Sequence, residues 1–389
     1  MTDTLTSHDI EQGELPEGWE SNTLNYFCEM YQPKTISRKE LVDDGPYPVF
    51  GANGQIGFYT DFNHEESEVT VTCRGATCGT VNVIPAMSWI TGNAMVVRPK
   101  DQSLGKEYLN YFLQSSDFTS VISGTAQPQI TRKTLSTLET VVAPRAEQER
   151  IVEILEDQLA RLETALESVH AVREKAARFR RSLLHAPFTG ALTGHEVEEG
   201  ELPSGWGQST IGELASIKTG KVDANAAVEN GEHAFFTCAR ETYRINDAPY
   251  EGKAVLVAGN GDLNVKYYEG KFNAYQRTYF LFSQDETLLR PRYLYFFLDS
   301  YLDRLRASAI GTTVKYIRLG DLRDAEIPLM PLPEQDRIVE ILEDQLSRLD
   351  ASLAVADAVE ERSAALRRSL LHSAFTGRLT REWREAVNV

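Results

Sequence analysis

The sequence contains a long internal repeat, which constrains the fold more than any other feature. The segment "EQERIVEILEDQLARL" begins at Glu147 and returns as "EQDRIVEILEDQLSRL" at Glu334, 187 positions later. "ELPEGW" at Glu14 and "ELPSGW" at Glu201 keep the same offset, and so do "RRSLLHAPFTGALT" and "RRSLLHSAFTGRLT". A repeat fixes the architecture of a chain because each copy forms the same structural unit. We therefore expect two tandem units, each with a variable domain followed by a near-constant helix.

The variable domains show strand and helix patterns together. "SEVTVTC", "AMVVRP" and "RTYFLFS" read as strands, and an aromatic helix pattern follows in each domain, "EYLNYFLQS" or "RYLYFFLDS". The fold class is therefore α/β (α+β), with two tandem domains joined by two long helices in a pseudo-twofold repeat. The expected segments are an N-terminal tail (1–13), a first domain (14–146), a first helix and linker (147–200), a second domain (201–333), and a second helix and C-terminal tail (334–389).

Two of these features make specific predictions about packing. Tyr111, Phe112, Phe296 and Phe297 recur at helical spacing, so we expect them in the core rather than stacked on bases. The near-constant helices carry apolar residues at alternating spacings of three and four, a coiled-coil seam that predicts an antiparallel pair of helices. The seam residues are Val152, Leu155, Leu159, Leu162, Leu166 and Val169 in the first helix, and Val339, Leu342, Leu346, Leu349, Leu353 and Ala356 in the second.

The placement of "ELPSGW" directly after the first helix also makes a topological prediction. Its equivalent, "ELPEGW", should lie beside the end of the second helix, which brings the two ends of the chain together. Pro144 and Pro333 precede the helices, where a missing N–H costs least, and Gly190 and Gly377 are expected to stop them.

The charge of the chain limits the kinds of partner that it can bind. The formal net charge is −17 over 389 residues, which argues against a non-specific nucleic-acid binder. By the same count the segments 14–146 and 201–333 carry only −5 and −2, so a basic face on either domain is possible. The four cysteines show no zinc-type spacing, and no metal site is expected. The polar start lacks the pattern of a signal peptide, and a cytoplasmic protein is expected.

In this order the motifs resemble a known family. "PYPVFGANGQIGFY", "RGATCGTV", "GTAQPQITRKTL" and "PRAEQERIVEIL" are followed by "KAVLVAGNG", "YYEGKFNAYQRTYFL" and "PLPEQDRIVEIL". Over essentially the whole chain, the sequence resembles the DNA specificity subunit of a type I restriction-modification system. The resemblance implies two target-recognition domains, each reading one half of a bipartite, asymmetric site in double-stranded DNA. It also implies that the helices set the spacer between the halves and dock two methyltransferase subunits.

The resemblance places the chemistry in other subunits. An adenine methyltransferase needs an (N/D)PP(Y/F/W) loop, and the sequence has neither that string nor a Walker A loop. The chain is therefore interpreted as a non-catalytic component without a cofactor of its own. S-adenosylmethionine is expected in the methyltransferase subunit, and ATP and Mg in a nuclease/translocase subunit where one is present.

Polar loops give the candidate DNA-binding residues, because Arg, Asn and Gln read base edges and Lys, Ser and Thr hold phosphates. In the first domain these are Lys34, Arg74, Thr77, Gln127, Gln129, Thr131, Arg132 and Lys133. In the second they are Asn260, Asn264, Lys266, Gln276, Arg277, Thr312, Thr313, Lys315, Tyr316 and Arg318.

Exposed positions are also alike in the two helices, which packing alone does not demand. Arg150, Glu153, Arg337 and Glu340 are therefore the candidate partner-binding residues. Two other functions are open: a stand-alone sequence-specific DNA-binding protein and a coiled-coil protein-protein adaptor. The target sequence, the spacer length, and whether the system restricts or only methylates DNA do not follow from the sequence.

Overall fold

The computed structural model describes residues 15–52, 54–124, 127–195 and 201–387. The predicted tail 1–13 and the linker positions 196–200 lie outside this part of the chain. The structure divides into two compact units: unit 1 contains the described residues up to Val169 and from Ala358 onward, and unit 2 contains those of His170–Asp357. No helix among the described residues is both long and apolar enough to cross a membrane.

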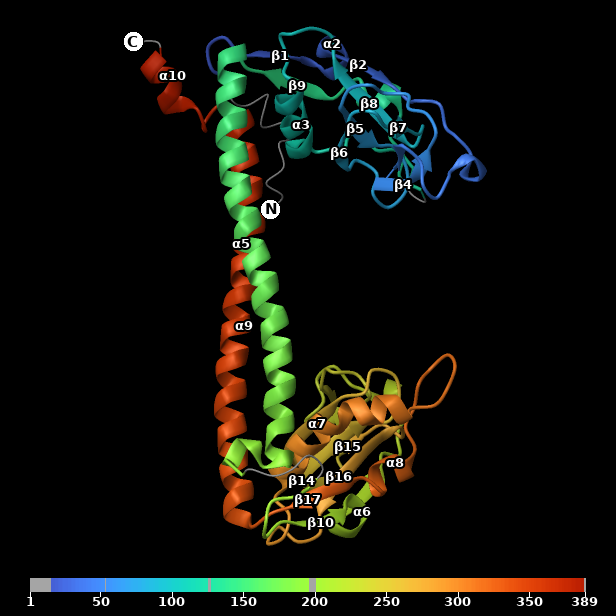
Figure 1. The fold of residues 1–389 in the computed structure, drawn as a ribbon, viewed down its shortest axis with the longest axis vertical. Helices are drawn as coiled ribbons and strands as arrows, with labels where there is room; N and C mark the ends of the chain where they lie inside the picture. Colours follow the sequence, from blue (N-terminus) through green and yellow to red (C-terminus); the bar gives the residue numbers. More distant parts are fainter. Residues whose placement is uncertain (1–14, 53, 125–126, 196–200, 388–389) are drawn as a thin grey trace. The chain divides into compact units, whose positions relative to one another are not determined.

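Unit 1 contains three groups of strands, two of them antiparallel and one mixed (Figure 1). The central sheet has the order β2-β8-β5-β6, a three-stranded sheet has the order β4-β3-β7, and β1 pairs with β9. Only β3 and β7 run parallel. The strands are β1 (Glu20–Thr23), β2 (Cys28–Tyr31), β3 (Tyr47–Gly51), β4 (Gly54–Tyr59), β5 (Glu68–Thr72), β6 (Val81–Ile84), β7 (Trp89–Ile90), β8 (Ala94–Pro99) and β9 (Glu139–Val142).

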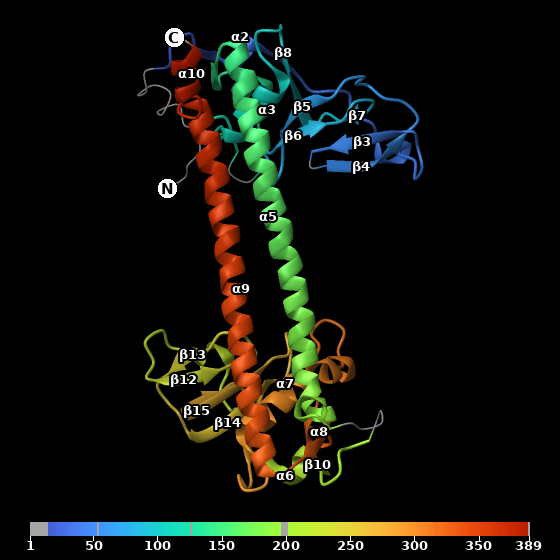
Figure 2. The same ribbon diagram turned by 60° about the vertical axis from the view of Figure 1, so that its left-hand side comes forward.

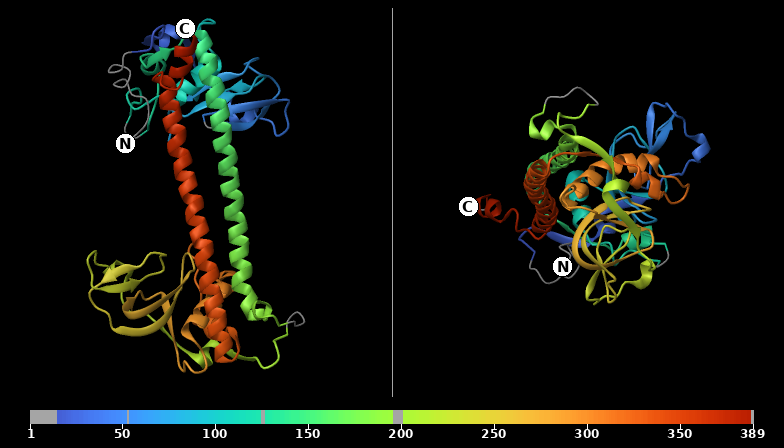
Figure 3. Two further views of the ribbon diagram at one scale, coloured as in Figure 1. Left: turned by 90° about the vertical axis from the view of Figure 1, so that its left-hand side faces the viewer. Right: turned by 90° about the horizontal axis from the view of Figure 1, so that it is seen from below.

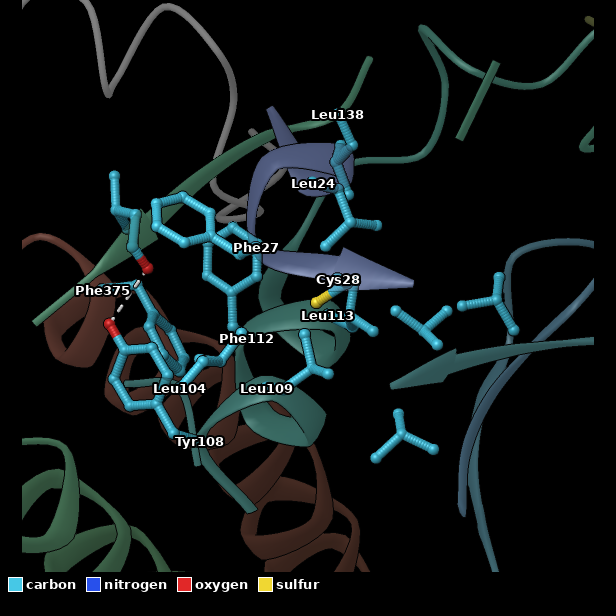
Figure 4. Close-up of a cluster of buried hydrophobic side chains, with 14 of the residues drawn as sticks. Leu24, Phe27, Cys28, Leu104, Tyr108, Leu109, Phe112, Leu113, Leu138 and Phe375 are labelled. Carbon is cyan, nitrogen blue, oxygen red and sulfur yellow. Dashed lines mark hydrogen bonds between the residues drawn. The ribbon is translucent and has the colours of Figure 1, made fainter. Parts of the chain in front are cut away.

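Helices cover one face of the central sheet of unit 1. The helices of this unit are α2 (Leu24–Phe27), η1 (Arg38–Glu40), α3 (Lys106–Ser115), α4 (Arg132–Leu135), α10 (Arg381–Val387), and parts of the long helices α5 (Arg145–His185) and α9 (Leu332–Phe375). Alternate residues of β5 and β8 pack with Tyr108, Phe112 and Phe375 in one core cluster, part of which Figure 4 shows in close-up. The hydroxyl of Tyr108 donates to the Val141 carbonyl at 3.2 Å, and burial raises the pKa of this phenol.

Unit 2 is built on a six-stranded sheet with the order β11-β16-β14-β15-β12-β13. Figure 2 labels four strands of this sheet, and Figure 3 shows the same ribbon from two further sides. A separate pair joins β10 and β17, and β12 runs parallel to β15. The strands are β10 (Gly207–Thr210), β11 (Ala215–Thr219), β12 (His233–Phe236), β13 (Tyr243–Ile245), β14 (Tyr250–Ala258), β15 (Val265–Ala274), β16 (Thr278–Ser283) and β17 (Glu326–Leu329).

The sheet of unit 2 is apolar on both faces. On one face, Val255, Val257 and Leu281 pack against a helix that carries Tyr293 and Phe297. On the other face, alternate residues form a second cluster that includes Phe236, Phe272 and Phe280. The helices are η2 (Ala186–Thr189), η3 (Ala191–Thr193), α6 (Ile211–Leu214), η4 (Ala224–Ala226), α7 (Pro291–Ser308) and α8 (Leu319–Arg323), with the remaining parts of α5 and α9.

The predicted core position of the helix aromatics is confirmed. Phe112, Phe296 and Phe297 are buried. Tyr111 is partly buried and packs against the core of unit 1.

The long helices are antiparallel within each unit, as predicted. In unit 1, Leu155 near the start of α5 shares a cluster with Leu371 near the end of α9. In unit 2 the later part of α5 lies beside the earlier part of α9. Arg173 forms an ion pair with Asp357 at 2.6 Å, and Arg180 forms one with Asp350 at 3.6 Å. A step of seven residues toward the C-terminus on α5 corresponds to a step of seven residues toward the N-terminus on α9, as antiparallel helices require. All twelve predicted seam residues are buried or half-buried.

The helix ends follow the predicted signals with one exception. Gly190 and Gly377 adopt left-handed φ angles of 77° and 72° after the helices. Pro144 precedes α5. Pro333 was expected before the second helix but is its second residue, where a missing N–H leaves no helical hydrogen bond unmade.

One buried carboxylate brings the two ends of the chain together in unit 1, as the repeat predicts. Glu147 accepts from the Trp19 indole at 2.9 Å and from the Thr380 hydroxyl at 2.6 Å, and it is ion-paired with Arg384. In unit 2 the equivalent Glu334 accepts from Trp206 at 3.0 Å. Both Trp–Glu pairs span 128 residues.

Candidate DNA-recognition site

A short loop in unit 2 closes on itself and projects from the sheet. Ile310 and Tyr316 exchange two backbone hydrogen bonds, at 3.0 and 2.9 Å, and the residues between them are exposed. We call residues 310–316 the finger of unit 2. Gly311 permits its tight turn, because φ is 113° and a Cβ would lie 2.3 Å from the Val314 carbonyl oxygen.

The finger is fastened to the loop that follows β14. The Gly261 N–H donates to the Lys315 carbonyl, and the Ile317 N–H donates to the Gly259 carbonyl, both at 2.9 Å. Gly259 in turn donates to the carbonyl of Arg277, also at 2.9 Å. Three loops that are remote in sequence therefore meet beside a shallow depression of about 520 Å³. Its lining includes Gln276, Arg277, Tyr316 and Arg318.

Unit 1 has the same device. Ser123 and Gln129 exchange backbone hydrogen bonds at 2.9 and 2.8 Å, and Ile130 donates to the Cys73 carbonyl at 2.9 Å. Gly75 donates to the Pro128 carbonyl at 3.2 Å, and Gly124 has a left-handed φ of 87°. We call the described residues of 123–129 the finger of unit 1; positions 125 and 126 are outside the description.

The two fingers occupy equivalent places in the repeat. Ser123 and Ile310, Gly124 and Gly311, and Gln129 and Tyr316 each differ by 187 in number. The two units thus share the same backbone hydrogen-bond arrangement, whereas most of the described side chains on the two fingers differ. Such a pair of sites can bind two ligands of one chemical class that differ in detail.

The structure brings most of the predicted DNA-binding residues to these places. In unit 1, Arg74 forms a backbone β-bridge with Gln129. Gln127 and Gln129 are on the finger, Thr131, Arg132 and Lys133 follow it directly, and Arg74 and Thr77 are in the loop that is hydrogen-bonded to it. In unit 2, Asn260 forms the equivalent bridge with Tyr316, and the group is Asn260, Gln276, Arg277, Thr312, Thr313, Lys315, Tyr316 and Arg318. Lys34 is on a different loop, after β2, and its carbonyl accepts from the Trp89 indole at 3.2 Å.

Four of the predicted DNA-binding residues also make hydrogen bonds that hold the local fold. Asn264 is buried, and its amide donates to the carbonyls of Cys238 and Asp262 at 3.0 and 2.9 Å. The ammonium of Lys266 donates to the Ala239 carbonyl at 2.6 Å, and burial lowers its pKa. Thr131 caps α4 by accepting from the Thr134 N–H at 3.2 Å. The Arg318 N–H donates to the Asp321 carboxylate at 2.7 Å, which fixes the start of α8. Residue type alone could not predict these bonds, because they depend on the fold around each residue.

Three of the candidate partner-binding residues are exposed, and Arg150 is half-buried. Arg150 and Glu153 are ion-paired with each other at 2.5 Å, while Arg337 and Glu340 are exposed.

Part of the identity between the helix starts has a structural cause that the sequence did not reveal. Gln148 and Gln335 are buried. Gln148 accepts from the Gly105 N–H at 2.8 Å, and Gln335 accepts from the Arg290 N–H at 2.9 Å. Each glutamine fastens the aromatic helix of its own unit to the long helix, so its conservation between the copies requires no partner.

The cysteine thiols, all of them in the described part of the chain, form no disulfide, and those of Cys28 and Cys73 are buried. Cys28, Cys73, Cys78 and Cys238 are free, and burial raises the pKa of Cys28 to about 12 and that of Cys73 to about 11. Within the described ranges, no group of three or more His, Cys, Asp and Glu residues has the geometry to hold a metal ion.

Comparisons with known proteins agree with this duplicated arrangement. The profile "Type I restriction modification DNA specificity domain" matches residues 16–169 and again 203–354. The specificity subunit of the type I restriction enzyme EcoDI from Escherichia coli is 38% identical over 192 residues, which cover 49% of this chain and 43% of that protein. The chain thus matches less than half the length of this relative.

Solved structures share the fold. A chain from a study of complex assembly and conformational transition of the type I R-M system gives a TM-score of 0.68 at 18% identity, and the match covers 94% of this chain and all of that one. The HsdS subunit from Thermoanaerobacter tengcongensis gives 0.54 at 17% identity, with coverages of 95% and 99%.

Two similar units, each with the same fastened finger and the same paired start and end of a long helix, define a protein built from a tandem repeat. The chain belongs to the type I restriction-modification DNA specificity family. The predicted family and fold class are confirmed. The names of the relatives also agree with a recognition component rather than an enzyme.

Proposed function

We propose that this chain is the specificity subunit of a type I restriction-modification complex, with each finger and its adjoining loops reading one half of a bipartite DNA site. One observation carries the proposal: the finger is held by the same backbone hydrogen bonds in both units, while its side chains differ. A shared backbone device is suited to a shared duplex geometry, and different side chains are suited to different bases.

The charge near the unit 2 finger fits this role. Arg277 and Lys315 are exposed, and their cationic side chains are suited to phosphate or guanine. The guanidinium of Arg318 is 3.3 Å from Asp321, so it is already oriented. An acidic chain with cations at two limited sites is expected to depend on partner subunits for tight binding.

The helices provide a duplicated surface for those partners. Phe179 on α5 and Leu366 on α9 are 187 positions apart, and each is 47% exposed. Both stand immediately before the repeated pair of arginines in "RRSLLH". Large apolar side chains at equivalent exposed positions are typical of interface anchors. We infer that two copies of a methyltransferase subunit dock here, one at each position, in the cytoplasm.

The chemistry belongs to those partners in this proposal. The methyltransferase subunit holds S-adenosylmethionine, and a nuclease/translocase subunit, in a system that restricts, uses ATP and Mg. This chain selects the DNA and determines the separation of the two methylated positions.

The test is to co-express the chain with its methyltransferase subunit in a host without DNA methylation and to map N6-methyladenine. A single asymmetric motif with an unspecified gap, absent when the chain is omitted, is the expected result. Sequence-specific DNA binding by the chain alone would instead support a stand-alone regulator. A stable complex with no new methylation supports a protein-protein adaptor.

The docking positions have a test of their own. Phe179→Asp and Leu366→Asp should each remove one methyltransferase copy, and the double variant should remove both, as measured by native mass spectrometry. Val355→Asp is the matched control, because Val355 is 65% exposed on α9 and its equivalent, Ser168, is polar. Retention of two copies by the double variant contradicts this docking model.

A further inference from the structure

The tip of the unit 2 finger carries an apolar side chain that the fold does not use. Val314 is 53% exposed, although the residues on either side of it are polar. The backbone that follows it is held, because the Lys315 carbonyl accepts from the Gly261 N–H and Tyr316 exchanges two backbone hydrogen bonds with Ile310. A side chain on a backbone held in this way loses little conformational entropy on binding.

The position has a polar counterpart in unit 1. Gln127 is 187 residues before Val314 and is also exposed. In the major groove, a glutamine amide can read the N6 and N7 atoms of adenine, whereas valine has no donor or acceptor. The only apolar group that base pairs present in this groove is the C5-methyl of thymine.

We propose that Val314 is a specificity-determining residue that recognises the methyl group of one thymine in the half-site read by unit 2. The proposal rests on the proposed function, and it adds the identity of one base-pair contact. The exposed Thr312 and Thr313 beside Val314 extend the surface with their own methyl groups, and Lys315 is placed to hold the adjoining phosphate.

The chemistry permits a test in which a single methyl group is removed from the DNA. Deoxyuridine pairs like thymidine but lacks the C5-methyl, so each thymine of the mapped site can be replaced in turn. Binding is measured with the complex of this chain and its methyltransferase. Wild-type complex should lose affinity roughly fourfold at one thymine, the factor that corresponds to about 0.8 kcal/mol for one buried methyl group.

The substitution Val314→Ala identifies which contact is responsible. This variant should bind the thymine duplex roughly fourfold more weakly and should be insensitive to deoxyuridine at that one position. Lys315→Ala is the control. It should weaken binding to all duplexes and keep the deoxyuridine effect, and the slope of log K against log[salt] should fall by about one, the value expected for one lost phosphate contact. Both residues are exposed, so neither change disturbs the core.

The proposal is overturned if Val314→Ala leaves every deoxyuridine effect intact, or if the half-site read by unit 2 contains no A·T pair. In either case, a wild-type complex that still prefers the mapped site to a scrambled duplex preserves the proposed function. Equal binding to both duplexes counts against the proposed function itself.

Discussion

Removing the carboxylate of Glu147 should loosen the start of α5 in unit 1 far more than the equivalent change loosens unit 2. Glu147 is 2% exposed and accepts from Trp19, Thr380 and Arg384. In Glu147→Ala, Arg384, whose side chain is 18% exposed, loses its counter-ion, and the indole N–H loses its acceptor.

The magnitude follows from these contacts. Breaking a buried ion pair by removing one partner costs about 3–5 kcal/mol. Arg384 still donates to Gly377 at 2.5 Å and to Thr380 at 3.1 Å, so we expect the lower end, about 3 kcal/mol. Glu334 and its partner His195 are 20% and 39% exposed, and Glu334→Ala should therefore cost only about 1 kcal/mol.

Hydrogen-deuterium exchange with mass spectrometry measures the two effects separately in the full chain, because each unit yields its own peptides. Exchange at the start of α5 should accelerate roughly a hundredfold in Glu147→Ala, and at the start of α9 by less than about tenfold in Glu334→Ala. Equal effects in the two units, or a change of less than about tenfold for Glu147→Ala, would show that the buried ion pair does not fasten the chain ends.

Three further predictions concern the finger, the pH dependence and the repeat. Gly311→Ala should weaken DNA binding by the complex at least tenfold in a titration, because its φ is 113° and its Cβ would lie 2.3 Å from a carbonyl oxygen. Gly261→Ala should have a smaller effect, because it meets only the strain of a left-handed φ of 71° and has open space around its Cβ. Equal losses for the two variants would contradict a role for the tight turn at Gly311. Burial by itself raises the pKa of Glu334, but hydrogen bonds from His195, Thr193 and Trp206 lower it overall below the ordinary 4.5. The stability contributed by Glu334 is therefore present above pH 4.5 and lost as the pH falls through the folded-state pKa, so the exchange difference between wild type and Glu334→Gln should shrink from pH 5 to pH 3. A fragment of residues 1–200 should form a homodimer, because unit 1 needs the α9 residues from Ala358 onward and only a second copy can supply their equivalents; a monomer in light scattering contradicts this.

The sequence predicted those parts of the fold that depend on periodicity and repetition. Leu155 and Leu342 recur at coiled-coil spacing and are fully buried, and the 187-residue offset correctly placed the N-terminal Trp19 near the C-terminal Thr380. The buried pairs made by Gln148 and Gln335 were not predictable, because their partners are more than 40 residues away in segments that differ between the units.

The recognition sites were predictable only in outline. Polar residues near Gly124 and Gly311 predicted the positions of both fingers. Only the exposure and the hydrogen bonds of each side chain in the structure distinguish exposed candidates from residues that hold the loops. Asn264 resembles a base reader by type and is a buried structural amide. Val314 was overlooked for the opposite reason, since an apolar residue gives no sign in the sequence that it is exposed on a rigid loop.

The central claim is that each unit reads its own half of the DNA site. The most direct measurement is to replace residues 201–333 with a second copy of residues 14–146 and to map N6-methyladenine with the methyltransferase subunit. The expected result is a symmetric motif in which the half-site of unit 1 appears twice in inverted orientation. An unchanged asymmetric motif would contradict the claim, because the second half-site would then be read by something other than residues 201–333.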